Sequence, residues 1–396
     1  MMGRIEALYT RPQDAGTAAC RKRYIAALIL SWGLLIPGLH RVEAQSTLAE
    51  RPYSCSSLRL MGHVCMASGG YEKAQPFLER ALHVAEETSG SNSDVYACML
   101  DLAFLYKSQG KLKDAEKMCL SGLELQEKAL REDHPYVAYT LRILSEIYRG
   151  QGRYREAESS LERAISIIHR VRPEDDQQSA PFLVDMGRVL VECGRLAEAE
   201  TYFDKALPLV QKSFGPEHLY TTKVLTSLAS LYVQQKRFAE AGELILRVLP
   251  IQERIYGADH HLLVPVWLLQ AAIRQAEGDL GEAKLLLDKS WRVVESQPDS
   301  GRPAQGKVLI GLGKFYLLNK EYARARDALE KALDIQASIF DEYHPRVADA
   351  LETLAELHRQ TGNIAEATRL QQRAKDIRVR QGLDSVPVAR IVEPAR

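Results

Sequence analysis

The sequence lacks the patterns on which most enzymes and metal sites depend. Its six cysteines are scattered without C-x-x-C spacing, so neither a zinc site nor a dense disulfide framework is indicated. It contains no H-E-x-x-H, no G-x-S-x-G and no Walker loop, the signatures of metalloproteases, serine hydrolases and nucleotide-binding loops. We therefore expect no catalytic residues, no bound metal and no cofactor, and we predict that the protein is not an enzyme.

An excess of charge of either sign is also missing. The 396 residues include 52 Lys+Arg and 52 Asp+Glu, so the formal net charge is zero. Proteins that bind nucleic acids neutralise phosphates with surplus cations, and we expect no nucleic-acid partner here. The hydrophobic content of 46% and charged content of 26% are ordinary for a folded soluble protein.

What the sequence has instead is an internal repeat. One alanine recurs at a spacing of 41 residues and then of 42 residues six times running, at Ala74, Ala115, Ala157, Ala199, Ala241, Ala283, Ala325 and Ala367. A period of this length predicts an array of stacked units rather than one closed core. Such an array lengthens by adding units, so the length of the chain does not imply two or three domains.

Each unit is predicted to be a helix, a turn and a second helix. In the third unit Pro135 suits the first position of a helix, and Leu144 and Tyr148 follow at helical spacing. Gly152 ends that helix, and Ala157 lies on the inner face of the next one. A small residue stands twelve positions before every anchor alanine and a large apolar residue three before it, the alternation that lets packed helices interdigitate.

These positions resemble the signature of a known repeat family. The tetratricopeptide-repeat pattern is matched in the third unit by Ser145, Tyr148, Gly152, Tyr154, Ala157 and Ala164. The 42-residue period and the openings His134-Pro135 and His344-Pro345 resemble more specifically the repeats of kinesin light chain and its bacterial relatives. The resemblance implies an all-α fold, a right-handed superhelical solenoid of about eight helix-turn-helix repeats over residues 54–380.

The N-terminal region has the layout of an export signal. Three basic residues at 21–23 precede sixteen uncharged residues at 24–39, and small residues occupy the −3 and −1 positions before a cleavage point after Ala44. Sixteen residues are short for a membrane span, which needs about 20. We expect residues 1–44 to be a signal peptide, cleaved near Ala44 in a periplasmic or secreted protein. An uncleaved anchor at 24–39, which would be the one membrane contact, and a buried helix of a cytosolic protein are the alternatives.

The segments around the repeats have no repeat pattern of their own. Residues 45–53 are predicted to be a linker, and residues 381–396 a flexible C-terminal tail. Four of the cysteines, Cys55, Cys65, Cys98 and Cys119, fall in the first two repeats. A disulfide between neighbouring helices is one interpretation of these four, and small core residues with free thiols are the other.

Four histidines recur at one position, 23 residues before the anchor alanine: His134, His218, His260 and His344. Each belongs to a different repeat, so they cannot gather into one metal site. Their place at the beginning of a first helix predicts a structural role.

In the family that the sequence resembles, the first helices line the concave face. That resemblance places eight residues on the predicted binding surface for a partner peptide or helix: Tyr139, Arg142, Glu146, Arg149, Asp185, Arg188, Lys223 and Thr226. Light-chain-like repeats often carry an Asn-Asn pair on this face, and this chain has none there. The type of cargo therefore does not carry over from the resemblance.

Two functions remain open at this point. The leading hypothesis is a non-enzymatic, exported scaffold for protein–protein interaction, which binds its partner in the concave groove. The alternative is a structural or assembly subunit of an envelope or membrane-associated complex, which uses the solenoid ends to oligomerise. It rests on Leu58, Met61 and Val64 of the first helix, because the end repeats of solenoids normally have polar outer faces. A cytosolic motor-adaptor role is disfavoured, since the chain has no N-terminal heptad repeat.

Overall fold

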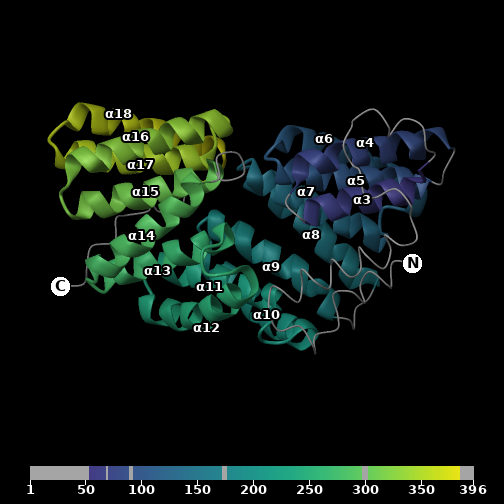
Figure 1. Ribbon diagram of the computed structural model, residues 1–396, viewed down its shortest axis with the longest axis horizontal. Helices are drawn as coiled ribbons and strands as arrows, with labels where there is room; N and C mark the ends of the chain where they lie inside the picture. Colours follow the sequence, from purple (N-terminus) through teal and green to yellow (C-terminus); the bar gives the residue numbers. More distant parts are fainter. Residues whose placement is uncertain (1–52, 68–69, 89–91, 172–175, 297–301, 384–396) are drawn as a thin grey trace, which may run out of the picture.

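The computed structural model describes residues 53–67, 70–88, 92–171, 176–296 and 302–383. Within these ranges, sixteen α-helices form eight helix-turn-helix pairs that follow one another along a curved array (Figure 1). The predicted all-α repeat solenoid is confirmed. The expected signal peptide or anchor, the linker up to residue 52 and the tail from residue 384 lie outside the described residues.

The helices keep the 42-residue period of the sequence. The first helices of the pairs are α3 (Cys55–Ala67), α5 (Asn92–Ser108), α7 (Pro135–Gly150), α9 (Asp176–Glu192), α11 (Leu219–Gln234), α13 (Val264–Ala276), α15 (Arg302–Leu318) and α17 (Pro345–Gln360). The second helices are α4 (Tyr71–Glu87), α6 (Leu112–Leu130), α8 (Tyr154–Val171), α10 (Leu196–Phe214), α12 (Phe238–Tyr256), α14 (Leu280–Glu295), α16 (Tyr322–Ile339) and α18 (Ile364–Arg380). A 3₁₀ turn, His261–Leu263, precedes α13.

The anchor alanines lie where each second helix packs on its first helix. All eight are buried, and the small residue twelve positions earlier faces the large side chain four positions after the anchor. A Cβ atom on Gly62 would lie 2.4 Å from Leu78 Cδ2, and one on Gly313 would lie 2.4 Å from Leu329 Cδ2. The small residues are therefore required by close packing between the two helices of a pair.

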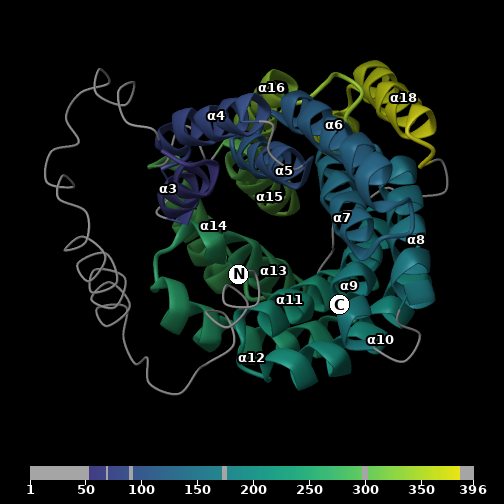
Figure 2. The same cartoon turned by 90° about the vertical axis from the view of Figure 1, so that its right-hand side faces the viewer.

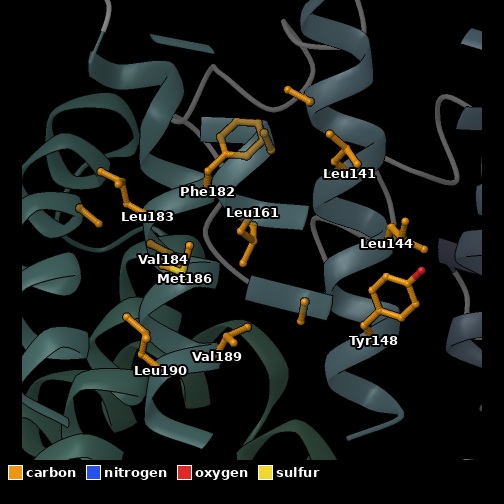
Figure 3. Close-up of a cluster of buried hydrophobic side chains, with 14 of the residues drawn as sticks. Leu141, Leu144, Tyr148, Leu161, Phe182, Leu183, Val184, Met186, Val189 and Leu190 are labelled. Carbon is orange, nitrogen blue, oxygen red and sulfur yellow. The ribbon is translucent and has the colours of Figure 1, made fainter. Parts of the chain in front are cut away.

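The third repeat shows how the apolar side chains of a pair converge. Leu141, Leu144 and Tyr148 lie along one side of α7, and Leu161 of α8 points into the space beside them (Figure 3). The same cluster continues into α9 through residues such as Phe182. One core thus runs through successive repeats, as expected for stacked units that cannot bury their apolar faces alone.

The four recurrent histidines cap the helices that follow them. In each case the ring Nδ1 accepts a hydrogen bond from the backbone N–H two residues further on, over 3.2 Å for His134, 3.1 Å for His218, 3.3 Å for His260 and 3.1 Å for His344. These bonds satisfy N–H groups that have no partner inside the helix. The structural role predicted for the histidines is confirmed.

The array curves so far that it nearly closes on itself. Figure 2 shows α5, α7, α9, α11, α13 and α15 on the inside of the ring and α4, α6, α8, α10 and α12 on the outside. This is the arrangement that the family resemblance implied. The concave face is therefore formed by first helices that surround a common centre.

The eighth repeat meets the third where the ring closes, a contact that we call the closure seam. His344 Nε2 lies 3.0 Å from the carbonyl oxygen of Gly150. Because His344 Nδ1 accepts the helix-capping bond, Nε2 carries the ring proton. It donates a hydrogen bond to the carbonyl oxygen of Gly150. Pro345 packs on Gly152, where a Cβ atom would lie 2.3 Å from Pro345 Cδ. Gly152 also has φ +79°, so both the close contact with Pro345 and the backbone conformation favour glycine at this position.

The end of the described chain adds to the closure seam. After α18 the backbone turns, and Gly382 packs against the guanidinium group of Arg155 in α8. Leu383 is 3% exposed and joins the apolar core of repeats two to five. The chain therefore stays packed for three residues beyond Arg380.

The first helix is less exposed than its sequence suggests. Leu58, one of the three residues on which the assembly hypothesis rests, is 1% exposed, because it packs against Ala81 and Ala85 of α4. The sequence could not show that the helix turns this residue toward its own repeat. Leu60 and Val64 remain exposed, at 55% and 49%. Among the described residues of α3, these two are the exposed large apolar side chains, and Met61 is partly buried.

Replacement of Gln336 by methionine is expected to raise the free energy of unfolding by about 1–2 kcal/mol. Gln336 is fully buried in α16, and neither its Oε1 nor its Nε2 has a hydrogen-bond partner among the described residues. Gln252, at the same repeat position, donates to the Thr222 hydroxyl over 3.2 Å. Gly306 stands where Thr222 stands in that repeat. Thermal unfolding compared with Gln252→Met, which should not stabilise, tests this; equal shifts would contradict it.

Candidate functional site

Charged side chains on the first helices of the first four repeats form three groups of ion pairs, which we together call the charge ladder. It runs through α3, α5, α7 and α9 and consists of Arg59, Asp101, Lys107, Arg142, Glu146, Arg149, Asp185, Arg188 and Glu192. Of these helices, α5, α7 and α9 line the inside of the ring (Figure 2). The 42-residue period brings them together from positions far apart in the sequence.

Most ladder contacts join successive first helices. Arg59 Nε donates to Asp101 Oδ2 over 2.6 Å, from α3 to α5. Lys107 of α5 pairs with Glu146 of α7. These ion pairs align neighbouring repeats on the concave side.

The centre of the ladder is Asp185 on α9. Its carboxylate receives Arg142 Nη1 of α7 at 2.9 Å and Arg188 Nη1 of its own helix at 3.3 Å. Arg142 also lies 3.5 Å from Glu146 Oε1. One buried carboxylate therefore forms ion pairs with two guanidinium groups that belong to different repeats.

The structure brings five of the eight predicted site residues together and leaves three outside. Arg142, Glu146, Arg149, Asp185 and Arg188 all belong to the charge ladder. The other three, Tyr139, Thr226 and Lys223, are not part of the charge ladder. The ring of Tyr139 packs on Phe182 with centroids 5.4 Å apart, the Thr226 hydroxyl donates to the Thr222 carbonyl over 2.8 Å, and Lys223 is exposed.

The ion pair of the charge ladder between Arg149 and Glu192 lies beside the closure seam. Arg149 Nη1 is 3.6 Å from Glu192 Oε1, and the Tyr154 hydroxyl is 3.5 Å from Glu192 Oε2. Burial alone would raise the pKa of Glu192, but the cations around it, led by Arg149 and Lys307, outweigh burial and lower it. Lys307 belongs to α15, so the ring brings a charge from the seventh repeat to the fourth.

Four cations surround Glu192, and we call them the cationic cluster: Arg149, Arg188, Lys307 and Arg346. Repulsion between these cations lowers the pKa of two of them, Lys307 and Arg188. Arg346 and burial lower the pKa of Lys307 to about 8, and Arg149 is the main cause of a lowered pKa at Arg188. Among the described residues no carboxylate lies within ion-pair distance of Lys307. The closure seam therefore has more positive than negative charge.

Some of these residues could have been found from the sequence and others could not. Lys107 and Lys307 occupy positions eight and eighteen residues before their anchors, the positions of Arg149 and Tyr139. Extending the concave-face pattern to every repeat would have found both. Glu192 and Arg346 lie at other repeat positions, and their roles depend on the closure of the ring.

The described residues show neither a metal site nor a membrane span. No group of three or more His, Cys, Asp or Glu side chains in those ranges could hold a metal ion. No described helix is both long enough and apolar enough to cross a bilayer.

Comparison with known proteins identifies the repeat. The family model described as tetratricopeptide repeat matches residues 95–168, 178–241, 223–296 and 305–378. These ranges cover more than half of the chain and follow its 42-residue period. A search of curated proteins found no match.

Solved structures share the fold at low sequence identity. The apo form of the quorum sensor NprR from B. thuringiensis aligns with a TM-score of 0.59 at 14% identity, over 91% of this chain and 94% of that one. A Rap protein complexed with Competence and Sporulation Factor gives 0.59 at 13%, over 83% and 99%. A kinesin light chain-like repeat protein from Podospora anserina gives 0.41 at 22%, over 50% and 95%.

Proposed function

The chain belongs to the tetratricopeptide-repeat family, and from that premise we propose that it is a non-enzymatic scaffold for protein–protein interaction. Solenoids of this kind bind partners on extended concave surfaces, and the concave face here is formed by the first helices (Figure 2). The partner is an extended peptide segment that lies against this face.

The surplus of positive charge at the closure seam carries the proposal on partner chemistry. The four cations of the cationic cluster face two carboxylates, Glu192 and Asp349, and Asp349 also pairs with Arg378. An acidic side chain or a C-terminal carboxylate would relieve the repulsion that lowers the pKa of Lys307. Complementary charge of this kind steers a partner and sets its register. The partner segment is therefore acidic.

The centre of the charge ladder is less suited to contact a partner first. Arg142 and Arg188 are both committed to Asp185, and a ligand there must replace ion pairs that already exist. Lys307 has no such competitor among the described carboxylates. Of the predicted residues, Arg149 therefore takes part at the seam, together with Lys307 and Arg346.

A lysine-to-glutamate change at Lys307 is expected to weaken binding of an acidic peptide about tenfold, or about 1.4 kcal/mol. The change reverses one of four cations and pairs it with Arg346, so the surplus charge falls. The measurement is fluorescence anisotropy of labelled oligoglutamate peptides with the full chain. Wild-type binding should also weaken as salt rises, because partly exposed charges are screened.

The matched control is Lys205→Glu, because Lys205 is an exposed lysine of α10 on the outside of the ring. Lys205→Glu changes the net charge by as much as Lys307→Glu does, and it should leave peptide binding unchanged. Equal loss in both variants, or equal binding of oligolysine and oligoglutamate to the wild type, would contradict an acidic partner at the seam.

Export with cleavage near Ala44 is part of the proposed function. It is supported by the basic residues, the sixteen uncharged residues and the small residues of the N-terminal sequence. Retention by an anchor at residues 24–39 is the alternative. Sequencing of the N-terminus of protein purified from its own cells distinguishes the two, since a mature chain would begin near Gln45.

A second candidate function is assembly through the end of the solenoid. The observation in its favour is the pair Leu60 and Val64, which leaves apolar surface on the outer face of the first repeat. Two copies, or one copy and an envelope subunit, would meet through this face. Sedimentation of the full chain tests self-association, and a monomer at all concentrations would exclude the homo-oligomer.

A further inference from the structure

Two thiols meet between the first and second repeats. Cys55 Sγ of α3 and Cys98 Sγ of α5 lie 3.3 Å apart. The residues are 43 positions apart in the sequence, close to the length of one repeat, so successive first helices present them to each other. Both are free thiols in this structure.

The surroundings hold the two sulfur atoms in place. Cys98 is fully buried and packs in the cluster that contains Leu58 and Ala81. One helical turn further along, Asp101 pairs with Arg59 and with His63. Contacts on both sides of the thiols therefore fix the separation of α3 and α5, and the approach of the sulfur atoms does not depend on them alone.

The two thiols differ in access. Cys55 lies in the first turn of α3 and is partly exposed, whereas Cys98 has no exposed surface. Burial and the nearby Cys55 raise the pKa of the Cys98 thiol. A reagent from solution therefore reaches Cys55 first, and Cys98 is positioned to react with whatever forms there.

We propose that Cys55 and Cys98 are a disulfide-forming pair that locks the first repeat onto the second. The Cys55 thiolate attacks an external disulfide, R–S–S–R, which gives a mixed disulfide and releases one R–S⁻. Cys98 then attacks Cys55 Sγ and passes its proton to the departing sulfur, which forms the Cys55–Cys98 bond and releases the second R group as R–SH. The two electrons from the thiols reduce the external disulfide to two thiols.

The bond would act where the solenoid is weakest. Among the described residues, the first repeat has a neighbouring repeat on one side only, and a repeat array is held together by contacts between neighbours. A bond from α3 to α5 encloses α4 in a covalent loop, so the first repeat cannot separate from the second while the bond is present. Its main effect is to restrict the opened chain.

The test is oxidation of the full chain with oxidised glutathione, followed by peptide mapping without reduction. We expect a cross-linked peptide that contains Cys55 and Cys98, lighter by two hydrogen atoms than the sum of its parts. Limited proteolysis within residues 55–87 should be about tenfold slower in the oxidised than in the reduced protein, because cleavage follows local opening.

Three variants complete the experiment. Cys55→Ser and Cys98→Ala should each abolish the cross-link and make proteolysis independent of glutathione, while Cys193→Ser, a cysteine of the fourth repeat, should retain both effects. A stable glutathione adduct on Cys55, a cross-link to Cys65 or Cys119, or wild-type thiols that stay reduced would overturn the proposal. Peptide mapping of the oxidised wild-type protein tests whether the Cys55–Cys98 bond forms, even if a variant folds poorly.

Discussion

Arg378→Met is expected to lower the free energy of unfolding of the C-terminal repeat by about 3–5 kcal/mol. Arg378 of α18 is almost fully buried, and its guanidinium donates to both carboxylate oxygens of Glu352 on α17, over 2.5 and 2.9 Å. A third bond of 2.8 Å reaches Asp349. Removing the cation would leave the buried Glu352 carboxylate without its partner, which costs more than the pair itself contributes.

Thermal unfolding by circular dichroism measures the loss, and two further variants interpret it. Glu352→Leu combined with Arg378→Met should regain most of the stability, because the pair is then replaced by apolar side chains of similar size. Arg369→Met removes an exposed arginine from the same helix, whose partner is Glu366, and should cost far less, because solvent screens exposed ion pairs. Equal losses for Arg378 and Arg369 would refute the buried pair as the cause.

Acidification from pH 7 to pH 4 is expected to cost about 3 kcal/mol through His344 alone. Burial lowers the pKa of this histidine from 6.5 to about 4. The unfolded chain takes up the proton near pH 6.5, whereas the folded chain does not until about pH 4. Between these values the unfolded state binds more protons, so the free energy of unfolding falls as the pH falls.

The contribution of His344 is therefore complete above pH 6.5 and is lost progressively down to pH 4. Protonation of Nδ1 would break the cap of α17, in which Nδ1 accepts the Arg346 N–H. Arg346 opposes the added charge, while Glu192 and Asp341 favour it. Glu192 itself has a lowered pKa, so its stabilising charge is lost only at pH values below the ordinary range of a glutamate.

The variant His344→Asn isolates this effect, because asparagine caps a helix without titrating. Lacking the bond to Gly150, the variant should be less stable than the wild type at pH 7 and more stable at pH 4. Urea unfolding at several pH values, with His134→Asn as the control for the cap alone, provides the measurement. Parallel stability curves for wild type and His344→Asn would refute the assignment.

The repeat and its helices could be predicted from the sequence because each depends on local pattern. The anchor Ala157, its large neighbour Tyr154 and the histidine caps follow from spacing within one unit, and all are buried or bonded as expected. The concave position of Arg142 and Arg149 followed from the family resemblance. In both cases the deciding contacts lie within one repeat or between adjacent ones.

The closure seam could not be predicted, because it depends on the accumulated curvature of five repeats. His344 and Gly150 are 194 residues apart, and no pattern in the sequence relates them. The same curvature brings Lys307 and Arg346 to Glu192. Small rotations between neighbouring repeats add along the array, and their sum determines which residues of distant repeats meet.

The closure seam also limits how this chain can change in length. A linear repeat array can gain or lose a unit wherever the duplication falls, because only neighbours touch. Here one more unit between α8 and α17 would carry His344 past Gly150 and move Leu383 away from the core that it completes. The number of repeats between the third and the eighth is therefore fixed by geometry, and variation in repeat number belongs before the third repeat, outside the segment that the closure seam joins.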